Sequence, residues 1–307
     1  MKPGRRNFNL ALAAVGSLMC ATRGGEALAQ AATADAPARR SFKTSDGVTL
    51  SYLETAPPGA AGALNIVLVP GWCMPAAIWR PQFATLGARY RTIAFDPRGQ
   101  GESEVAQAGY TAKRRAADLH ECIAAAVPAR SKVLLTGWSL AALEALEYVF
   151  LHGDRRLAGL ALIDSSVGEL PVPPGGGGSP TSDSPFKQRL RRERARMLEE
   201  FVRAIFANPP PAEELKALAE AAQRMPVEDS IALLSYPYPR EHWKEVAHAF
   251  KKPLLYAVTP QFAAQAGNLK KNRPATRIEV FQKAGHALFA DEPDRFNQLI
   301  LNFASSL

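Results

Sequence analysis

The sequence predicts an α/β fold in which a mostly parallel eight-stranded sheet carries helices on both faces. Short buried apolar runs alternate with amphipathic helical stretches, a pattern typical of parallel sheets. An Asp-Gly turn within residues 41–55 indicates an antiparallel hairpin at one edge. The alternation stops between residues 167 and 242, which predicts a helical cap inserted after the sixth strand. With 307 residues and 47% apolar composition, the chain is long enough for one large core and this insertion.

The hairpin supplies two of the expected strands, and the buried apolar runs supply the other six. Those runs are Ile66–Val69, Thr92–Phe95, Val133–Thr136, Leu157–Ile163, Leu254–Val258 and Ile278–Phe281. Core helices are expected near 78–90, 112–126, 140–152, 260–271 and 293–306. The domain order that follows is a core over 41–166, the cap over 167–242 and the rest of the core over 243–307. Pro and Gly residues within 171–178 mark the entry to the cap.

The first residues differ from the rest of the chain. A basic start is followed by the apolar run Leu10–Met19 and by the small-residue pattern Ala27-Leu28-Ala29. This pattern predicts a signal peptide over 1–29, followed by a linker over 30–40, and hence a periplasmic or secreted protein. The apolar run is about half the length of a membrane-spanning helix, so we expect no stable membrane anchor. Arg5-Arg6 is compatible with twin-arginine export, and the route stays open.

The formal net charge of +8 falls to +5 without residues 1–29, which hold four basic residues and one acidic residue. Much of the remaining excess lies in 187–196, where apolar residues at helical spacing continue to Ile205. An amphipathic helix with a basic outer face is expected. That face is either simply solvated or in contact with an anionic surface. No motif supports binding to nucleic acid.

Two cysteines, Cys73 and Cys122, follow the predicted signal peptide. An oxidising compartment permits a disulfide between them, but the sequence does not give their distance. Neither belongs to a spacing typical of metal sites, so no metal ligand set is predicted.

The segment Gly137-Trp138-Ser139-Leu140-Ala141 directly follows an apolar strand and opens a helix. This is the strand–turn–helix setting in which a serine hydroxyl is exposed for nucleophilic attack. Ala141 stands where a second glycine is usual. The alternative is a tight turn in which Ser139 only caps the helix.

The turn Val69-Pro70-Gly71-Trp72 ends an earlier strand. In an acyl hydrolase, backbone N–H groups at such a place stabilise the developing oxyanion. The backbone N–H groups of Trp72 and Leu140 are the two expected donors. A plain type II turn is the alternative interpretation of Pro-Gly-Trp.

His286 follows the last predicted strand, and parallel strands gather functional groups at their carboxyl ends. It is therefore the expected general base. An acid is needed to orient its imidazole ring, yet no Asp or Glu occurs between Phe250 and Arg277. Asp164, at the carboxyl end of the sixth strand, is the predicted acid. Its alternative role is that of a turn carboxylate.

With these residues in place, the chain resembles the α/β-hydrolase superfamily over 41–166 and 243–307. The most specific match is Asp96-Pro97-Arg98-Gly99-Gln100-Gly101-Glu102-Ser103, which is similar to the family's loop after the fourth strand. The resemblance is closest to small esterases, lactonases and perhydrolase-like members with a helical cap. It implies the order Ser, acid, His, which Ser139, Asp164 and His286 obey, and structural roles for Asp96 and Arg98. It implies no metal or organic cofactor.

The expected function is hydrolysis of a small-molecule carboxylic ester or lactone through an acyl-enzyme. The substrate pocket is expected between core and cap, lined by Trp72, Trp138 and cap side chains, although both tryptophans could equally pack at the sheet edge. Serine-dependent cleavage of an amide or a carbon–carbon bond is a second interpretation. A non-catalytic, hydrolase-like binding protein is a third, motivated by Ala141 and by the missing acid after the seventh strand.

Overall fold

The computed structural model describes residues 36–55, 64–172, 184–235 and 237–307. The predicted signal peptide over 1–29 lies outside these ranges and stays a prediction. The same holds for 173–178, the larger part of the Pro- and Gly-rich entry to the predicted cap.

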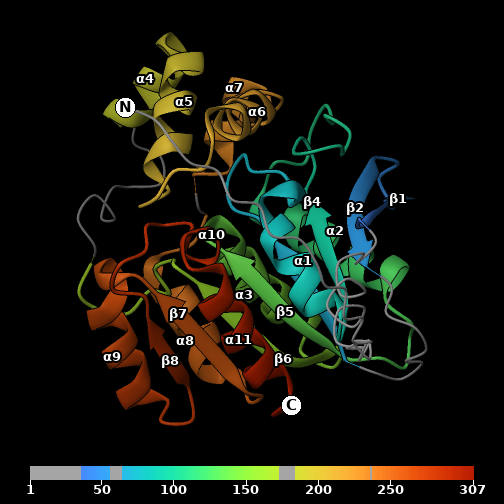
Figure 1. The fold of residues 1–307 in the computed structure, drawn as a ribbon, viewed down its shortest axis with the longest axis vertical. Helices are drawn as coiled ribbons and strands as arrows, with labels where there is room; N and C mark the ends of the chain where they lie inside the picture. Colours follow the sequence, from blue (N-terminus) through green and yellow to red (C-terminus); the bar gives the residue numbers. More distant parts are fainter. Residues whose placement is uncertain (1–35, 56–63, 173–183, 236) are drawn as a thin grey trace, which may run out of the picture. The chain divides into compact units, whose positions relative to one another are not determined.

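Within the described residues, eight strands form one sheet in the order β1-β2-β4-β3-β5-β6-β7-β8 (Figure 1). β2 pairs with both β1 and β4 in antiparallel fashion, and the remaining neighbours are parallel. The predicted fold class is therefore confirmed. The strands are β1 (Ala38–Lys43), β2 (Thr49–Thr55), β3 (Asn65–Val69), β4 (Arg91–Asp96), β5 (Val133–Trp138), β6 (Leu157–Ile163), β7 (Leu254–Val258) and β8 (Arg277–Val280).

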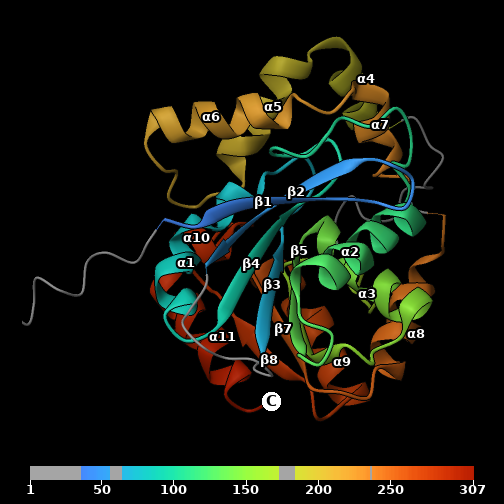
Figure 2. The same cartoon turned by 90° about the vertical axis from the view of Figure 1, so that its right-hand side faces the viewer.

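Helices cover both faces of the sheet, and each face has its own apolar core (Figure 2). One face carries η1 (Ala76–Trp79), α1 (Arg80–Gly87), α10 (Leu288–Asp291) and α11 (Pro293–Ala304). The other face carries α2 (Ala112–Ala126), α3 (Leu140–His152), α8 (Arg240–Ala249), η2 (Pro260–Phe262) and α9 (Ala263–Asn272). Because side chains alternate along a strand, neighbouring residues of each inner strand enter opposite cores.

β1 begins at Ala38, inside the stretch 30–40 that the sequence predicts as linker. Residues 38–43 pair with β2 along their whole length. Two arginines fix this edge strand, since Arg39 forms an ion pair with the buried Asp96 and Arg40 with Glu54. The hairpin therefore extends further toward the N-terminus than its apolar pattern indicates.

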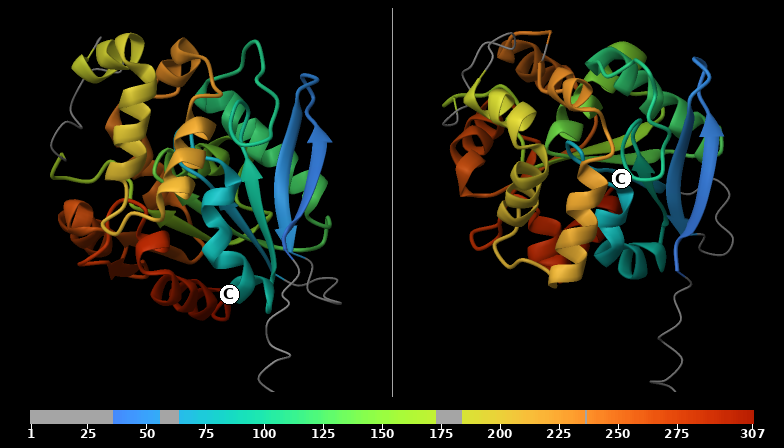
Figure 3. Two further views of the ribbon diagram at one scale, coloured as in Figure 1. Left: turned by 45° about the horizontal axis from the view of Figure 1, so that its top comes forward. Right: turned by 90° about the horizontal axis from the view of Figure 1, so that it is seen from above.

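Four helices follow β6: α4 (Pro185–Arg192), α5 (Arg194–Ala204), α6 (Ala212–Ala222) and α7 (Val227–Ala232). We call them the inserted helices. They lie together at one end of the sheet in Figures 1 and 2, and Figure 3 shows them in yellow to orange from above. Their apolar side chains join the core that contains α1 and α11. The next helix, α8, starts inside the range 167–242 that the sequence predicts as the cap. It packs against α3, however, and contributes to the core that contains α2 and α3.

The basic amphipathic segment is two helices rather than one, because the backbone leaves the helical conformation at Glu193, between α4 and α5. Its inward face is apolar as predicted, with Leu190 and Leu198 fully buried. On the outer face, Arg189 and Arg191 form ion pairs with Glu200 and Glu228. Part of the excess positive charge of this segment is thus balanced locally.

Cys73 and Cys122 are both free thiols. They belong to the two different apolar cores, on opposite faces of the sheet. A disulfide needs Cα atoms within about 7 Å of each other, and the sheet lies between these two. The disulfide that the sequence left open is therefore absent.

No helix in the described ranges is both long enough and apolar enough to cross a membrane.

Candidate active site

Ser139 lies in the turn between β5 and α3, with backbone angles of φ 56° and ψ −122°. A positive φ is unusual for a residue with a side chain and costs conformational energy. The turn is fixed by hydrogen bonds from Ser139 N–H to the carbonyl of Ile163 (2.8 Å) and from Ala142 N–H to the carbonyl of Ser139 (3.0 Å). A Cβ atom at Gly137 would come within 2.3 Å of the Ala141 carbonyl oxygen. The strand and the helix can approach this closely only because residue 137 is glycine.

Backbone strain is concentrated around this turn. Among the described residues, the non-glycine residues with positive φ are Cys73, Ser139 and Asp164. They follow β3, β5 and β6, three neighbouring parallel strands, at their carboxyl ends. Such strain persists where the surrounding structure enforces it, and it clusters at functional sites.

The structure brings Ser139, His286 and Asp164 into one hydrogen-bonded chain. His286 Nε2 lies 2.8 Å from Ser139 Oγ, and His286 Nδ1 lies 2.7 Å from Asp164 Oδ2. The Asp164 side chain is buried, whereas the His286 side chain is 29% exposed. An alcohol, an imidazole and a carboxylate in this order form a nucleophile, its base and the group that orients the base.

Asp164 is held by the loop that follows β7. Its second oxygen, Oδ1, accepts hydrogen bonds from the backbone N–H of Thr259 (2.6 Å) and from the Thr259 hydroxyl (2.8 Å). This loop contains no carboxylate. It supplies two donors instead, which fix a carboxylate that comes from the neighbouring strand. The acid after β6 thus has both a base to orient and a rigid support.

Replacing Thr259 with valine removes the hydroxyl donor but keeps the backbone donor and the side-chain shape. We expect kcat for an ester substrate to fall about tenfold, which corresponds to about 1.4 kcal/mol, because Asp164 becomes freer to rotate away from His286. Thr259→Ser keeps the hydroxyl and is the matched control. Steady-state kinetics of both variants check this expectation, and an equal loss of kcat in Thr259→Ser, which keeps the hydroxyl, would contradict the role given to that donor.

The turn after β3 lies directly beside the serine. A Cβ atom at Gly71 would come within 3.0 Å of the Ser139 Cβ. Within the described part of the chain, the backbone N–H groups of Trp72 and Leu140 have no hydrogen-bond acceptor. Two unpaired amides next to a nucleophile are what stabilisation of an oxyanion requires.

The side chain of Gln100 fixes the turn after β3 by hydrogen bonds. Its side-chain amide donates to the carbonyls of Gly71 (3.0 Å) and Met74 (2.7 Å), and its oxygen accepts from Arg115 (3.1 Å). Arg115 in turn forms a buried ion pair with Glu144 of α3, the helix that begins at the serine. The turn and the nucleophile helix are therefore tied together by one buried polar network.

The two tryptophans predicted to line the substrate pocket are packed into the structure instead. The Trp138 ring is 1% exposed and lies against His286, and its Nε1–H donates to the carbonyl of His286 (2.8 Å). The Trp72 ring is buried beside Phe186 and Phe201 of the inserted helices, and its Nε1–H donates to the carbonyl of Ser230 (2.7 Å). Both rings have hydrogen-bond donors that need partners when buried, and satisfying them locks the rings in place.

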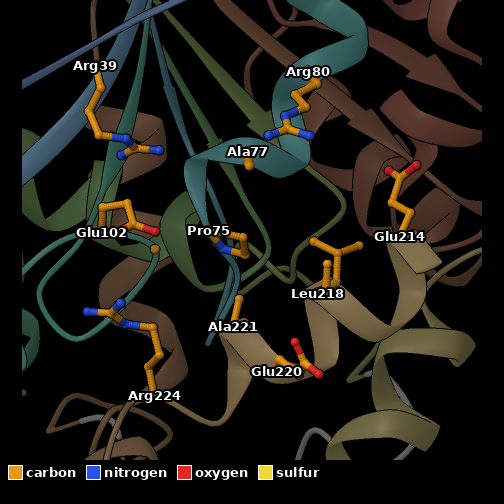
Figure 4. Close-up of a pocket in the computed structure, with 12 residues that line it drawn as sticks. Arg39, Pro75, Ala77, Arg80, Glu102, Glu214, Leu218, Glu220, Ala221 and Arg224 are labelled. Carbon is orange, nitrogen blue, oxygen red and sulfur yellow. The ribbon is translucent and has the colours of Figure 1, made fainter.

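A cavity of about 450 Å³ lies between α6 and the start of α1 (Figure 4). Arg39 and Arg224 lie on one side of it and Glu214 on the other. The cavity lies between an inserted helix and the core of the fold, which is where the sequence predicts a substrate pocket. Neither tryptophan lines it, and no residue of the Ser139–His286–Asp164 chain does.

Two further ionisable groups near the site stay neutral. Burial raises the pKa of the Cys73 thiol to about 12, so at neutral pH it is a thiol and not a competing nucleophile. Burial, followed by the charge of Asp164, raises the pKa of Tyr256 well above its usual value. Its hydroxyl donates to the carbonyl of Ser165, next to Asp164 (2.6 Å).

No group of three or more potential metal ligands occurs among the described residues.

Sequence reasoning missed Gln100, Thr259 and Asp291. Gln100 belongs to the quoted Asp96–Ser103 segment, and Asp291 follows His286 closely, so both positions carried a signal in the sequence. Their contacts join segments that are far apart in the chain, for example Asp291 with Ala207. No local pattern reports such contacts.

Comparisons with known proteins show a family and a fold. A family model described as the alpha/beta hydrolase family matches residues 66–299. A pimeloyl-acyl-carrier-protein methyl ester esterase from Aeromonas hydrophila subsp. hydrophila is 27% identical over 78% of this chain and 94% of its own length. The solved structure of an esterase from Exiguobacterium antarcticum is similar with a TM-score of 0.73 and 21% identity, over 86% of this chain and 98% of that one. The enol-lactonase from Burkholderia xenovorans LB400 is similar with a TM-score of 0.70 and 19% identity, over 87% and 100%.

Proposed function

Because the chain belongs to the alpha/beta hydrolase family and is an enzyme of that type, we propose that it cleaves carboxylic esters or lactones through an acyl-enzyme on Ser139. The observation that carries this proposal is the continuous chain from Ser139 Oγ to His286 to Asp164, with contacts of 2.8 and 2.7 Å. Each group already has the distance that its step requires.

In the first half-reaction, Ser139 Oγ attacks the substrate carbonyl carbon while its proton passes to His286 Nε2. The tetrahedral intermediate collapses, the carbon–oxygen bond to the alcohol breaks, and His286 returns the proton to the departing alkoxide. Water repeats the sequence on the acyl-enzyme, which releases the acid and restores Ser139. In a lactone the departing alkoxide remains covalently part of the acyl group, so the second step releases one hydroxy acid.

Asp164 keeps the imidazole in the tautomer with hydrogen on Nδ1, so that Nε2 can accept the serine proton. The negative charge that develops on the carbonyl oxygen is stabilised by the N–H groups of Trp72 and Leu140. Loss of one such donor typically costs about 3 kcal/mol of transition-state stabilisation.

An oxygen leaving group is supported by the Aeromonas relative, whose name assigns it a methyl ester substrate. Lactones are cyclic esters and require the same groups. The His286 side chain is part-exposed and Ser139 is half-buried, so these two residues are not sealed from solvent.

The test is a panel of short-chain aryl esters, aliphatic methyl esters, lactones and amides, each assayed with the purified protein. We expect turnover of esters or lactones and covalent labelling of Ser139 by a serine-directed phosphonate, located by peptide mass spectrometry. Turnover restricted to amides would replace the ester proposal with amide cleavage. Absence of both turnover and labelling would indicate a non-catalytic binding protein.

A further inference from the structure

Three consecutive residues of the loop that carries the base are each fixed by a hydrogen bond. Gly285 N–H donates to Asp291 Oδ2 (2.8 Å), the His286 carbonyl accepts from Trp138 Nε1–H (2.8 Å), and Ala287 N–H donates to the carbonyl of Ile205 (2.7 Å). The backbone on both sides of His286 is thus determined by groups from other parts of the fold.

The Asp291 carboxylate also accepts hydrogen bonds from two residues that follow the inserted helix α5. Oδ2 also accepts from the N–H of Ala207 (2.9 Å), and Oδ1 accepts from the N–H of Asn208 (2.8 Å). These residues follow α5, so one carboxylate connects the end of an inserted helix to the loop of His286. Three backbone N–H donors on one ionised carboxylate are charge-assisted hydrogen bonds, which are stronger than neutral ones.

The two connected segments are in direct backbone contact. A Cβ atom at Gly285 would come within 2.6 Å of the Ala207 nitrogen and 2.8 Å of the Ile205 oxygen. Any displacement of residues 205–208 therefore presses on Gly285 or opens a gap beside it. Pressure displaces Gly285, the residue next to the base, and a gap removes the backbone contacts that hold it.

We propose that Asp291 is a positioning residue for His286. A complete Ser139–His286–Asp164 chain then requires residues 205–208 to keep their observed position beside the loop of His286. This inference rests on the proposed function, in which His286 is the base. Catalytic groups need to be held within about 0.5 Å of their working positions. Asp291 touches none of the reacting atoms and acts through the backbone of residue 285.

The first variant is Asp291→Asn, which keeps the size of the side chain but replaces one accepting oxygen with an NH₂ group. That group cannot accept from backbone N–H donors, so at least one of the three bonds is lost. We expect kcat to fall 10- to 100-fold with KM within twofold of the unmodified protein. A residue that only stabilised the fold would lower the unfolding temperature without this change in kcat below the transition.

The matched control is Asp294→Asn. Asp294 is an exposed acid three positions further along, and its side chain makes no hydrogen bond within the described residues. The Asp294→Asn variant removes the same charge from the same region, and we expect its kcat to stay within twofold of that of the unmodified protein. Equal losses in Asp291→Asn and Asp294→Asn would overturn the proposal, because they would assign the effect to charge and not to the three bonds.

A second variant covers the case in which Asp291→Asn does not fold. Asn208→Pro deletes one of the two N–H donors that follow α5 and leaves the bond between Asp291 and Gly285 untouched. Residue 208 already precedes a run of prolines. We expect kcat to fall at least threefold, and an unchanged kcat would overturn the dependence on residues 205–208.

A readout without substrate separates this inference from the proposed function. The hydrogen-bonded Nδ1–H proton of His286 should give a strongly downfield ¹H NMR signal, assigned by its loss in His286→Ala. We expect this signal to weaken or disappear in Asp291→Asn and to persist in Asp294→Asn. A signal that persists in both would overturn the positioning role, whereas failure of all substrates with the signal behaving as expected would contradict only the ester hydrolase proposal.

Discussion

Replacing Ser139 with alanine should lower kcat for a short aryl ester by about 10⁶-fold, the order of the loss when a serine protease loses its nucleophile. The variant retains the unpaired N–H groups of Trp72 and Leu140, so it should still bind substrate. It has no hydroxyl to form the acyl-enzyme. The measurement is steady-state hydrolysis together with the mass of the phosphonate-treated protein, in which residue 139 should stay unlabelled.

Ser165→Ala is the matched control for this change. Ser165 lies next to Asp164, and its hydroxyl makes no hydrogen bond within the described residues. We expect Ser165→Ala to retain most of the activity and all of the labelling. Turnover by Ser139→Ala at the rate of the unmodified protein would show that the nucleophile lies elsewhere.

Replacing Asp164 with asparagine should lower kcat by about 10⁴-fold while the fold stays intact, as the same exchange does in a serine protease. Thr259 donates two hydrogen bonds to one oxygen of residue 164, and the asparagine carbonyl oxygen can still accept them. The NH₂ group then faces His286 Nδ1 as a donor. This favours the tautomer with hydrogen on Nε2, which cannot take the serine proton.

The measurement compares kcat and the unfolding temperature of Asp164→Asn with those of Asp294→Asn, which removes the same charge from an exposed position. An Asp164→Asn variant as active as the unmodified protein would require another acid. The absence of any Asp or Glu between Phe250 and Arg277 leaves the loop after β7 without a candidate.

The sequence alone predicted the sheet, its parallel direction and the residues that meet at its carboxyl edge. Periodicity and turn chemistry are local properties, and they identify Gly137–Leu140 as a strand–turn–helix and residues 41–55 as a hairpin. In a parallel sheet these local assignments have a non-local consequence, because the carboxyl ends of neighbouring strands lie at one edge. Ser139, Asp164 and His286 could therefore be named before their distances were known.

Only the tertiary structure decided how those three groups are held. That Thr259 donates twice to Asp164, that Trp138 supports His286 from inside the core, and that Asp291 joins the base to residues 205–208 all depend on contacts across more than 80 positions of the chain. The tertiary structure also decided that Cys73 and Cys122 lie in different cores, with the sheet between them. Such contacts arise from the packing of elements against one another, and the pattern within any one element carries no record of its partner.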